Sequence, residues 1–305
     1  KNNLSFEILT SGTTSVSKNI GVKMSNCIRH VKTNSKTKSI WGMGYPCGSY
    51  ASTQVFFQSL INRETIIYLF ETDFKSSDEI FSNYKITNLS CTPTFLSMLL
   101  INLKKEYSSV LKITTGGEKI KKSLIKSFKK IFTSAEYINI YASTETGSLL
   151  YSNSEYFSIP KKSESQIKIE NNTLKVHKSL LNDVPKNKGD WYDTNDIVEF
   201  VNDSQFRFVS RSNGYLNTGG FRISPSQIED KIQGIEGVRD VHVYGKPNSL
   251  LGSIICADVI GKGISSKNLK LELKKQSIEK HLIPQIIRIV DSFEHILNGK
   301  KKIMT

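Results

Sequence analysis

The chain is poor in cysteine and contains no long apolar run. Its four cysteines, Cys27, Cys47, Cys91 and Cys256, are far apart and form no C-x-x-C pair. We therefore expect reduced thiols in a cytoplasmic protein rather than a disulfide framework. No apolar run approaches the roughly eighteen residues of a spanning helix, and none of signal-peptide type follows Lys1. The sequence predicts neither a membrane span nor a secretion signal.

Histidine is scarce, and acidic residues are fewer than basic ones. The five histidines show no i, i+4 pair and no carboxylate at metal spacing, so no structural metal is expected. The net charge is +14, from 42 Lys and Arg against 28 Asp and Glu. The lysines are spread along the chain and no nucleic-acid-reading motif occurs, so we expect no nucleic acid partner.

The densest basic stretch has the pattern of an amphipathic helix. Between Glu118 and Phe132 the apolar residues Ile120, Leu124 and Phe128 recur at helical spacing, and lysines lie between them. These lysines are expected to form a solvated face. An acidic protein partner stays open as an alternative.

The length and the pattern predict two domains. At 305 residues the chain exceeds the size at which a single core keeps growing. Strand-like runs alternate with helical patterns, which favours a covered, largely parallel sheet. The strand-like runs are Thr65–Phe70, Leu111–Thr115 and Tyr137–Tyr141, and the helical ones are Thr94–Lys105 and Lys119–Phe132.

A region of short strands follows, and then a smaller α+β module. Short strands are predicted at Gln166–Glu170, Thr173–His177, Ile197–Asn202 and Gln205–Ser210, with turn chemistry at Asn171-Asn172 and at Asn202–Ser204. The later module is predicted to hold a helix from Pro225, strands at Val238–Tyr244 and Ser253–Val259, a helix at Lys267–His281 and a strand at Ile286–Val290. We expect a large domain over 1–211 and a small domain over 212–305.

The stretch from Ile8 to Lys18 carries the strongest signal. An apolar strand runs into small hydroxyl residues, one glycine and a lysine. Such a loop can fold around a polyphosphate and donate hydrogen bonds to it from several sides. It is not a Walker loop, which needs a second glycine directly before the lysine. Taken alone, it is equally well a surface turn.

Four further stretches follow in order: Tyr137–Gly147, Trp191–Asp196, Phe208–Pro225 and Leu297–Lys300. Together with the loop they resemble the motifs of the adenylate-forming superfamily, which contains acyl-CoA synthetases, aryl-CoA ligases and nonribosomal adenylation domains. Arg211 follows Asp196 by fifteen positions, and Lys300 follows Arg211 by eighty-nine. Both distances are similar to the spacings of that family.

The resemblance implies an α/β fold: a large domain of mixed and parallel sheets covered by helices, with a short β-hairpin region, and a small α+β C-terminal domain. It implies ATP-dependent activation of a small carboxylic acid to an acyl- or aryl-adenylate, with release of pyrophosphate. The acyl group would then pass to a thiol, either CoA or the phosphopantetheine of an acidic acyl carrier protein. ATP and Mg²⁺ are the implied cofactors. A degenerate, non-catalytic nucleotide- or carrier-protein-binding member is the alternative.

The resemblance also assigns roles to residues. Lys300 and Thr144 would act on the α-phosphate, and Glu145 would hold Mg²⁺. Asn213 would be the hinge of the small domain. The nucleotide-binding residues would be Thr10, Ser11, Gly12, Thr13, Thr14, Lys18, Gly116, Gly117, Glu118, Tyr141, Ala142, Asp196, Arg211 and Asn217.

Each assignment has a plainer alternative. Lys300 could be a solvated lysine of the basic tail, and Asp196 could cap a turn. Both Glu145 and Glu118 could be acids at a helix start. Gly219-Gly220 could be a β-bulge rather than a thin backbone along which a pantetheine arm passes.

Several departures from the family put substrate choice in doubt more than ATP binding. Ser15 and Ser17 stand where the family has Gly and Pro, and Asn213 stands where it has Asp or Lys. Nine residues precede Thr10, far fewer than in the family, which suggests a fragment or a compact member. The stretch from Glu145 to Trp191 is shorter than usual, and residues 41–60 offer no counterpart of a histidine that many relatives have there.

Overall fold

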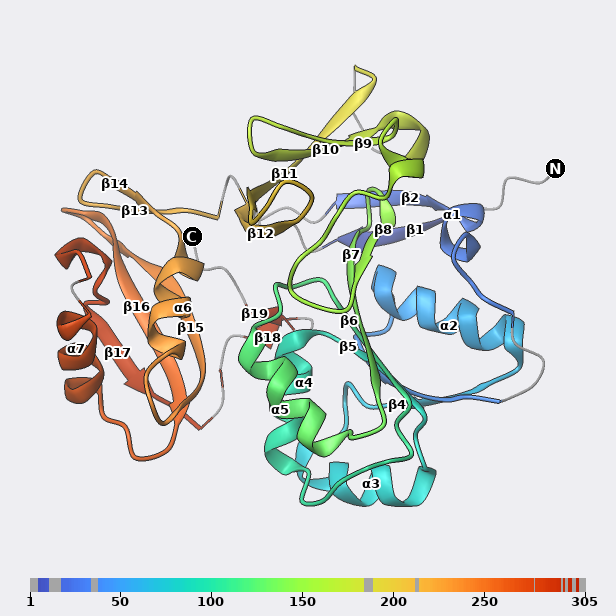
Figure 1. Ribbon diagram of the computed structural model, residues 1–305, viewed down its shortest axis with the longest axis horizontal. Helices are drawn as coiled ribbons and strands as arrows, with labels where there is room; N and C mark the ends of the chain where they lie inside the picture. The colour runs from blue at the N-terminus through green and yellow to red at the C-terminus, as the bar shows by residue number, and fades with distance from the viewer. Residues whose placement is uncertain are drawn as a thin grey trace. The chain divides into compact units, whose positions relative to one another are not determined.

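The chain folds into two compact units (Figure 1). One consists of residues 1–194, 199–207 and 298–300, and the other of residues 195–198, 208–297 and 301–305. The computed structural model describes residues 5–10, 18–33, 38–183, 189–211, 214–276, 278–291, 293, 296–297 and 300–301. The domain boundary at residue 211 stays a prediction, since residues 212 and 213 lie outside these ranges.

A six-stranded sheet forms the centre of the first unit. Its order is β4-β3-β5-β6-β7-β8, and every neighbouring pair is parallel except β7 and β8. The predicted covered, largely parallel sheet is therefore confirmed. The strands are β3 (Ile40–Gly44), β4 (Thr65–Tyr68), β5 (Asn88–Cys91), β6 (Lys112–Gly116), β7 (Glu136–Ser143) and β8 (Gly147–Ser152).

Helices cover both faces of this sheet (Figure 1). On one face α3 (Ser77–Tyr84), α4 (Pro93–Asn102) and α5 (Lys122–Ile131) enclose the main core. On the other face lies α2 (Tyr50–Asn62). Because Ile125 and Phe128 of α5 are buried while the lysines of that helix are exposed, the predicted solvated lysine face is confirmed.

Helix α2 buries small polar residues and exposes large apolar ones, unlike an ordinary surface helix. It turns Ser52, Val55 and Ser59 toward the protein, whereas Phe56 and Leu60 are 50% and 58% exposed. No charged residue occurs in its thirteen positions. Helix α2 is nevertheless no candidate for a membrane span, since no helix in the described ranges is long and apolar enough to cross a bilayer.

A separate hairpin packs beside α2. Strands β1 (Ser5–Thr10) and β2 (Lys18–Lys23) are antiparallel, and the short helix α1 (Met24–Ile28) follows. Ile8, Ile20 and Val22 of the hairpin pack in one cluster with Tyr50 at the start of α2. The apolar strand leading to the predicted phosphate loop is thus fixed by packing against α2.

The predicted region of short strands forms a four-stranded sheet of order β12-β11-β10-β9. Asn171 and Asn172, both at positive φ (52° and 57°), make the tight turn from β9 to β10, as their sequence predicts. The strands are β9 (Ile167–Glu170), β10 (Thr173–His177), β11 (Trp191–Phe200) and β12 (Phe206–Arg211). Strand β11 begins at Trp191, six residues before the predicted strand at Ile197.

The second unit is an α+β module. Its sheet has the order β14-β13-β16-β15, and β17 runs parallel to β16. The elements are β13 (Leu216–Thr218), β14 (Phe221–Ile223), α6 (Pro225–Gln233), β15 (Val238–Asn248), β16 (Gly252–Gly261), α7 (Ser266–Lys275) and β17 (Ile286–Ile289). Helix α7 ends well before the predicted His281, because Leu273 is its last buried apolar residue.

The chain ends in a two-stranded sheet of β18 (Ile296–Leu297) and β19 (Lys300–Lys301). Four short 3₁₀ turns complete the described elements: η1 (Phe74–Ser76), η2 (Lys161–Ser163), η3 (Lys178–Leu180) and η4 (Lys280–Leu282).

Candidate functional site

Thr144 and Glu145 lie in a tight turn between β7 and β8. The flanking residues Ser143 and Gly147 pair across the two strands. Within the turn, the Thr146 N–H donates to Ser143 Oγ at 3.2 Å, and Gly147 has a φ of 71°. The alternative that Glu145 stands at a helix start is therefore wrong. The turn closes a hairpin at the carboxyl end of a parallel strand, where α/β sheets bind their ligands.

A buried asparagine holds this turn from outside. Asn182, 4% exposed, donates from Nδ2 to Thr144 O at 2.7 Å and from its N–H to Glu145 O at 2.8 Å. Its own Oδ1 accepts from Asn26 Nδ2 at 2.7 Å. Two carbonyls of the turn are thus bound by one residue. Sequence reasoning missed Asn182, because it follows Thr144 by 38 positions and no motif links the two.

The Glu145 carboxylate is available to a ligand. Within the described part of the chain it forms no hydrogen bond or ion pair, and its residue is only partly exposed. A carboxylate next to phosphate oxygens is the donor set that Mg²⁺ prefers. The residues present therefore fit a magnesium ion shared with a nucleotide. No three His, Cys, Asp or Glu side chains of the described residues gather into a metal site of their own.

The predicted adenine-side residues follow β6, directly beside β7. A side chain at Gly116 would meet Ile140 O at 2.9 Å, so the approach of β7 alone requires glycine there. Glu118 Oε2 accepts from the Thr94 N–H at 3.0 Å, in the first turn of α4. Glu118 thus does serve a helix start, but that of α4 rather than of the following α5. Contact of this segment with adenine stays a prediction.

Tyr141 and Ala142 lie on β7, just before the turn. Both are partly buried, and Ala142 packs against the cluster formed by the β1–β2 hairpin. The hairpin is also joined to the residue after Asn182, since the Asp183 N–H donates to Gly21 O at 2.9 Å. Packing and hydrogen bonds therefore bring the hairpin and the acidic turn together within the first unit.

The predicted phosphate loop connects the two strands of this hairpin. Thr10 and Lys18 pair opposite each other at its end, so they bracket the loop. Ser11, Gly12, Thr13 and Thr14 lie outside the described residues.

The remaining predicted residues belong mainly to the second unit. Asp196 is 8% exposed on β11, Arg211 ends β12, and Asn217 is exposed on β13. Lys300 lies on β19, and Asn213 is outside the described residues. Whether Asp196 caps a turn or binds ribose stays open, as does the role of Lys300.

Gly219 and Gly220 form the two-residue turn of the β13–β14 hairpin, with φ of 54° and 84°. They are thus a turn and not the β-bulge considered above. The positive φ at both positions explains why glycine stands there.

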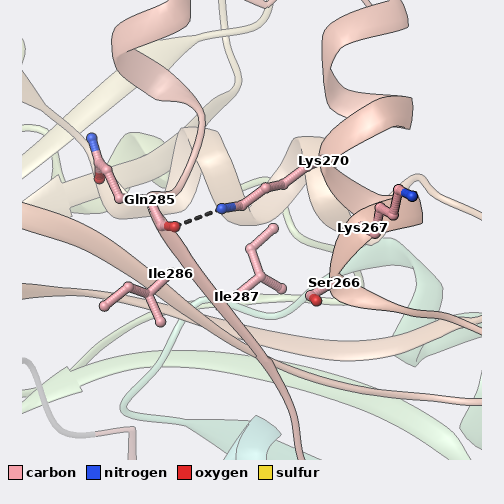
Figure 2. Close-up of a pocket in the computed structure, with 6 residues that line it drawn as sticks. All are labelled: Ser266, Lys267, Lys270, Gln285, Ile286 and Ile287. Carbon is pink, nitrogen blue, oxygen red and sulfur yellow. Dashed lines mark hydrogen bonds between the residues drawn. The ribbon is translucent and has the colours of Figure 1, made fainter.

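The second unit also contains a pocket of about 420 Å³ between α7 and β17 (Figure 2). It is lined by Ser266, Lys267, Lys270, Gln285, Ile286 and Ile287. Lys270 Nζ already donates to Gln285 O at 2.6 Å. None of the predicted site residues lines it.

Comparison with known families decides the relationship. Residues 1–189 match the model of the AMP-binding enzyme, and residues 227–300 match that of the AMP-binding enzyme C-terminal domain. This chain belongs to the AMP-binding enzyme family. The family predicted from the five motifs is confirmed, and residues 190–226 lie between the two matches.

Curated relatives of this AMP-binding chain are distant in sequence. A putative long chain fatty acid-CoA ligase, VraA of Staphylococcus haemolyticus, is 23% identical over 219 residues, which cover 67% of this chain and 47% of VraA. Surfactin synthase subunit 2 of Bacillus subtilis is 22% identical over 354 residues, covering 98% of this chain and 10% of that protein. The chain spans about half of VraA and much less of the synthase.

Solved structures of the family share the fold. The o-succinylbenzoate CoA synthetase MenE of Bacillus subtilis, in complex with its acyl-adenylate intermediate, superposes with a TM-score of 0.70 at 18% identity, covering 97% of this chain and 67% of that one. Its complex with ATP and magnesium gives a TM-score of 0.69 at 18% identity, covering 97% and 68%. The predicted fold, a large mixed α/β part followed by a smaller C-terminal part, is confirmed.

Proposed function

We propose that this AMP-binding chain activates a small carboxylic acid with ATP, forming an acyl- or aryl-adenylate and releasing pyrophosphate. The observation that carries the proposal is the turn of Thr144 and Glu145. It is held by Asn182 at the carboxyl end of β7 and presents a carboxylate that has no hydrogen-bond or ion-pair partner among the described residues. The MenE structures with an acyl-adenylate and with ATP and magnesium support the same chemistry in a relative.

The reaction needs cations and hydrogen-bond donors positioned around the phosphates rather than a protein nucleophile. A carboxylate that attacks the α-phosphate spreads negative charge over the phosphoryl oxygens in the transition state. Glu145 would hold a Mg²⁺ ion, and Thr144 would contact the α-phosphate. The hydroxyls and Lys18 of the β1–β2 loop would hold the outer phosphates. Lys300 would neutralise charge between the α-phosphate and the attacking carboxylate.

The nucleoside would be held by residues of several predicted motifs. Tyr141, Ala142 and residues 116–118 would lie on the adenine side. Asp196, with Arg211, would bind the ribose hydroxyls, and Asn217 would lie near the nucleotide. By the resemblance to the family, we further propose that the small domain, residues 212–305, moves about Asn213 between two half-reactions. The second would pass the acyl group to CoA or to an acyl carrier protein.

The test measures acid-dependent ATP–pyrophosphate exchange over amino, aryl and fatty acids, with Lys300→Ala beside wild type. Lys300 acts mainly in the transition state, so we expect the exchange rate to collapse while ATP binding is largely kept. Lys301→Ala and Lys302→Ala are the matched controls. Equal losses at all three positions would reduce Lys300 to part of a basic tail.

One observation favours a second candidate, a nucleotide- or carrier-binding protein without catalysis. The chain carries Ser15, Ser17 and Asn213 at positions where the family has other residues. In that case ATP binds, as calorimetry would detect, but no acid supports exchange and Lys300→Ala changes nothing.

A further inference from the structure

Arg29 and Tyr50 are two donors that converge beside the acidic turn. Arg29 directly follows α1, and Tyr50 is the first residue of α2. Gly147 has no side chain, and a methyl group on its Cα would lie 2.8 Å from the Tyr50 hydroxyl and 3.1 Å from Arg29 Nη2. Both donors therefore approach one point on the turn that carries Glu145.

The Tyr50 hydroxyl has no hydrogen-bond acceptor among the residues that the structure describes. Its side chain is 6% exposed, and the hydroxyl forms no hydrogen bond with the described residues. Burial raises the pKa of Tyr50, and the nearby Cys27 adds to the rise, whereas Arg29 opposes it. The group therefore keeps its proton at neutral pH and offers it to a ligand. A buried hydroxyl without an acceptor is rare, because it loses its hydrogen bonds to water and gains none.

Arg29 supplies the charge at this point. Its residue is exposed, its guanidinium donates to Thr146 O at 3.4 Å, and no carboxylate of the described residues pairs with it. The neighbouring His30 packs edge-on against Tyr151, with 5.5 Å between ring centroids. Burial and, secondly, Arg29 lower the pKa of His30. His30 is therefore mostly neutral at neutral pH, and Arg29 is the cation.

We propose that Arg29 and Tyr50 bind a second carboxylate of the acid that is activated at the turn, so that the substrate class is dicarboxylic. This rests on the proposed function, since the first carboxylate is the one that reacts beside Thr144. Neither the guanidinium nor the phenol pairs with a carboxylate of the described residues, and both groups can donate hydrogen bonds to a carboxylate of a ligand. Both carboxylates would lie against one short turn, which favours a chain of a few carbons between them.

The experiment compares adipate with hexanoate, which share six carbons but differ in the second carboxylate. Calorimetry of the 305-residue chain with a non-hydrolysable ATP analogue measures the affinity for each acid. We expect wild type to bind adipate at least about tenfold more tightly, the contribution of a charged hydrogen bond. Arg29→Ala should reduce the adipate-to-hexanoate affinity ratio about tenfold, and Tyr50→Phe about threefold. Tyr107→Phe, whose hydroxyl donates to Asp78 Oδ1 at 2.6 Å, is the matched control and should keep the ratio.

The outcomes separate this inference from the proposed function. Equal losses for both acids in Arg29→Ala would leave Arg29 as a residue that only positions Thr146, and would overturn the inference. The inference would also be overturned if wild type preferred hexanoate or bound neither acid. It would equally be overturned if Arg29→Ala weakened only the binding of the ATP analogue. Pyrophosphate exchange with hexanoate would then still support the proposed function. Adipate binding that depends on Arg29, without exchange, would support the carboxylate site and reject the activation.

Discussion

Each unit places an arginine beside a tyrosine of low exposure, but only one of these pairs contains a carboxylate. In the second unit, Arg288 Nε and Nη2 donate to the two oxygens of Asp258, both at 2.8 Å, and Nη2 also donates to Tyr244 OH at 3.1 Å. In the first unit, Arg29 and Tyr50 meet beside Gly147 with no described acid next to them. The Arg288 group is complete within the chain, whereas the Arg29 group has no carboxylate among the described residues.

Strand register explains why the Asp258 group is complete. Asp258 pairs with Arg288 on the neighbouring strand, and its carboxylate is only 2% exposed. A buried carboxylate needs such partners, because leaving water costs it several kcal/mol of solvation. The Arg29 guanidinium is exposed and keeps its water until a ligand arrives. We therefore expect the Asp258 group to serve stability and the Arg29 group to serve binding.

The largest expected effect is that of Asp258→Ala. It leaves Arg288 and Tyr244 without their acceptor, and we expect the free energy of unfolding to fall by about 2–4 kcal/mol. Arg288 is 42% exposed and can partly regain water, so the lower half of this range is favoured. Urea denaturation measures the change. The control is Glu199→Ala at the exposed pair with Arg207, where less than about 1 kcal/mol is expected. Equal losses of stability in Asp258→Ala and Glu199→Ala would contradict the stabilising role of the Asp258 group.

A smaller loss is expected for Asn182→Ala, which removes the support of the acidic turn. Its side chain bonds Thr144 O and Asn26, so we expect a loss of about 1–2 kcal/mol. Amide hydrogen exchange should also show faster opening around Glu145. Asn202→Ala, in an exposed turn held by the same kind of side-chain bonds, is the control for general loss of an asparagine. If amide exchange at residues 144–147 were unchanged in Asn182→Ala, the turn would be stable without Asn182.

The two tyrosines should differ when each loses its hydroxyl. Tyr244→Phe removes an acceptor of Arg288 and should cost about 1 kcal/mol. Tyr50→Phe removes a buried hydroxyl without an acceptor, so stability should change by less than about 0.5 kcal/mol or rise slightly. Urea denaturation of both variants measures the difference. A clear loss in Tyr50→Phe would mean that the hydroxyl has an internal partner.

The smallest expected effect concerns pH. The pKa of His30 is lowered in the folded protein, first by burial and then by Arg29. The unfolded chain therefore binds this proton more tightly, and the stability that His30 contributes is present above its ordinary pKa and lost as the pH falls through the lowered one. In Arg29→Ala the pKa of His30 should rise toward its ordinary range without reaching it, as NMR titration can measure. No shift would place Arg29 too far away to form the proposed site.

The sequence by itself determined the family, the alternation of strands and helices in the first unit, and most of the elements of the second. These features lie in short windows: the alternation of strands and helices, the turn chemistry of Asn171-Asn172, and the five motifs. Element ends were less predictable where buried contacts decide them, as at Lys275 of α7.

Only the tertiary structure decided how the site is held and what surrounds it. Asn182 binds a turn 38 positions earlier, Arg29 reaches Thr146 from 117 positions away, and Glu118 binds the start of α4 rather than of α5. No local pattern encodes these contacts, because an isolated Asn, Arg or Glu in a sequence is equally compatible with a solvated side chain. The packing of the sheet and the hairpin brings each of them to its partner, and it leaves Tyr50 buried without one.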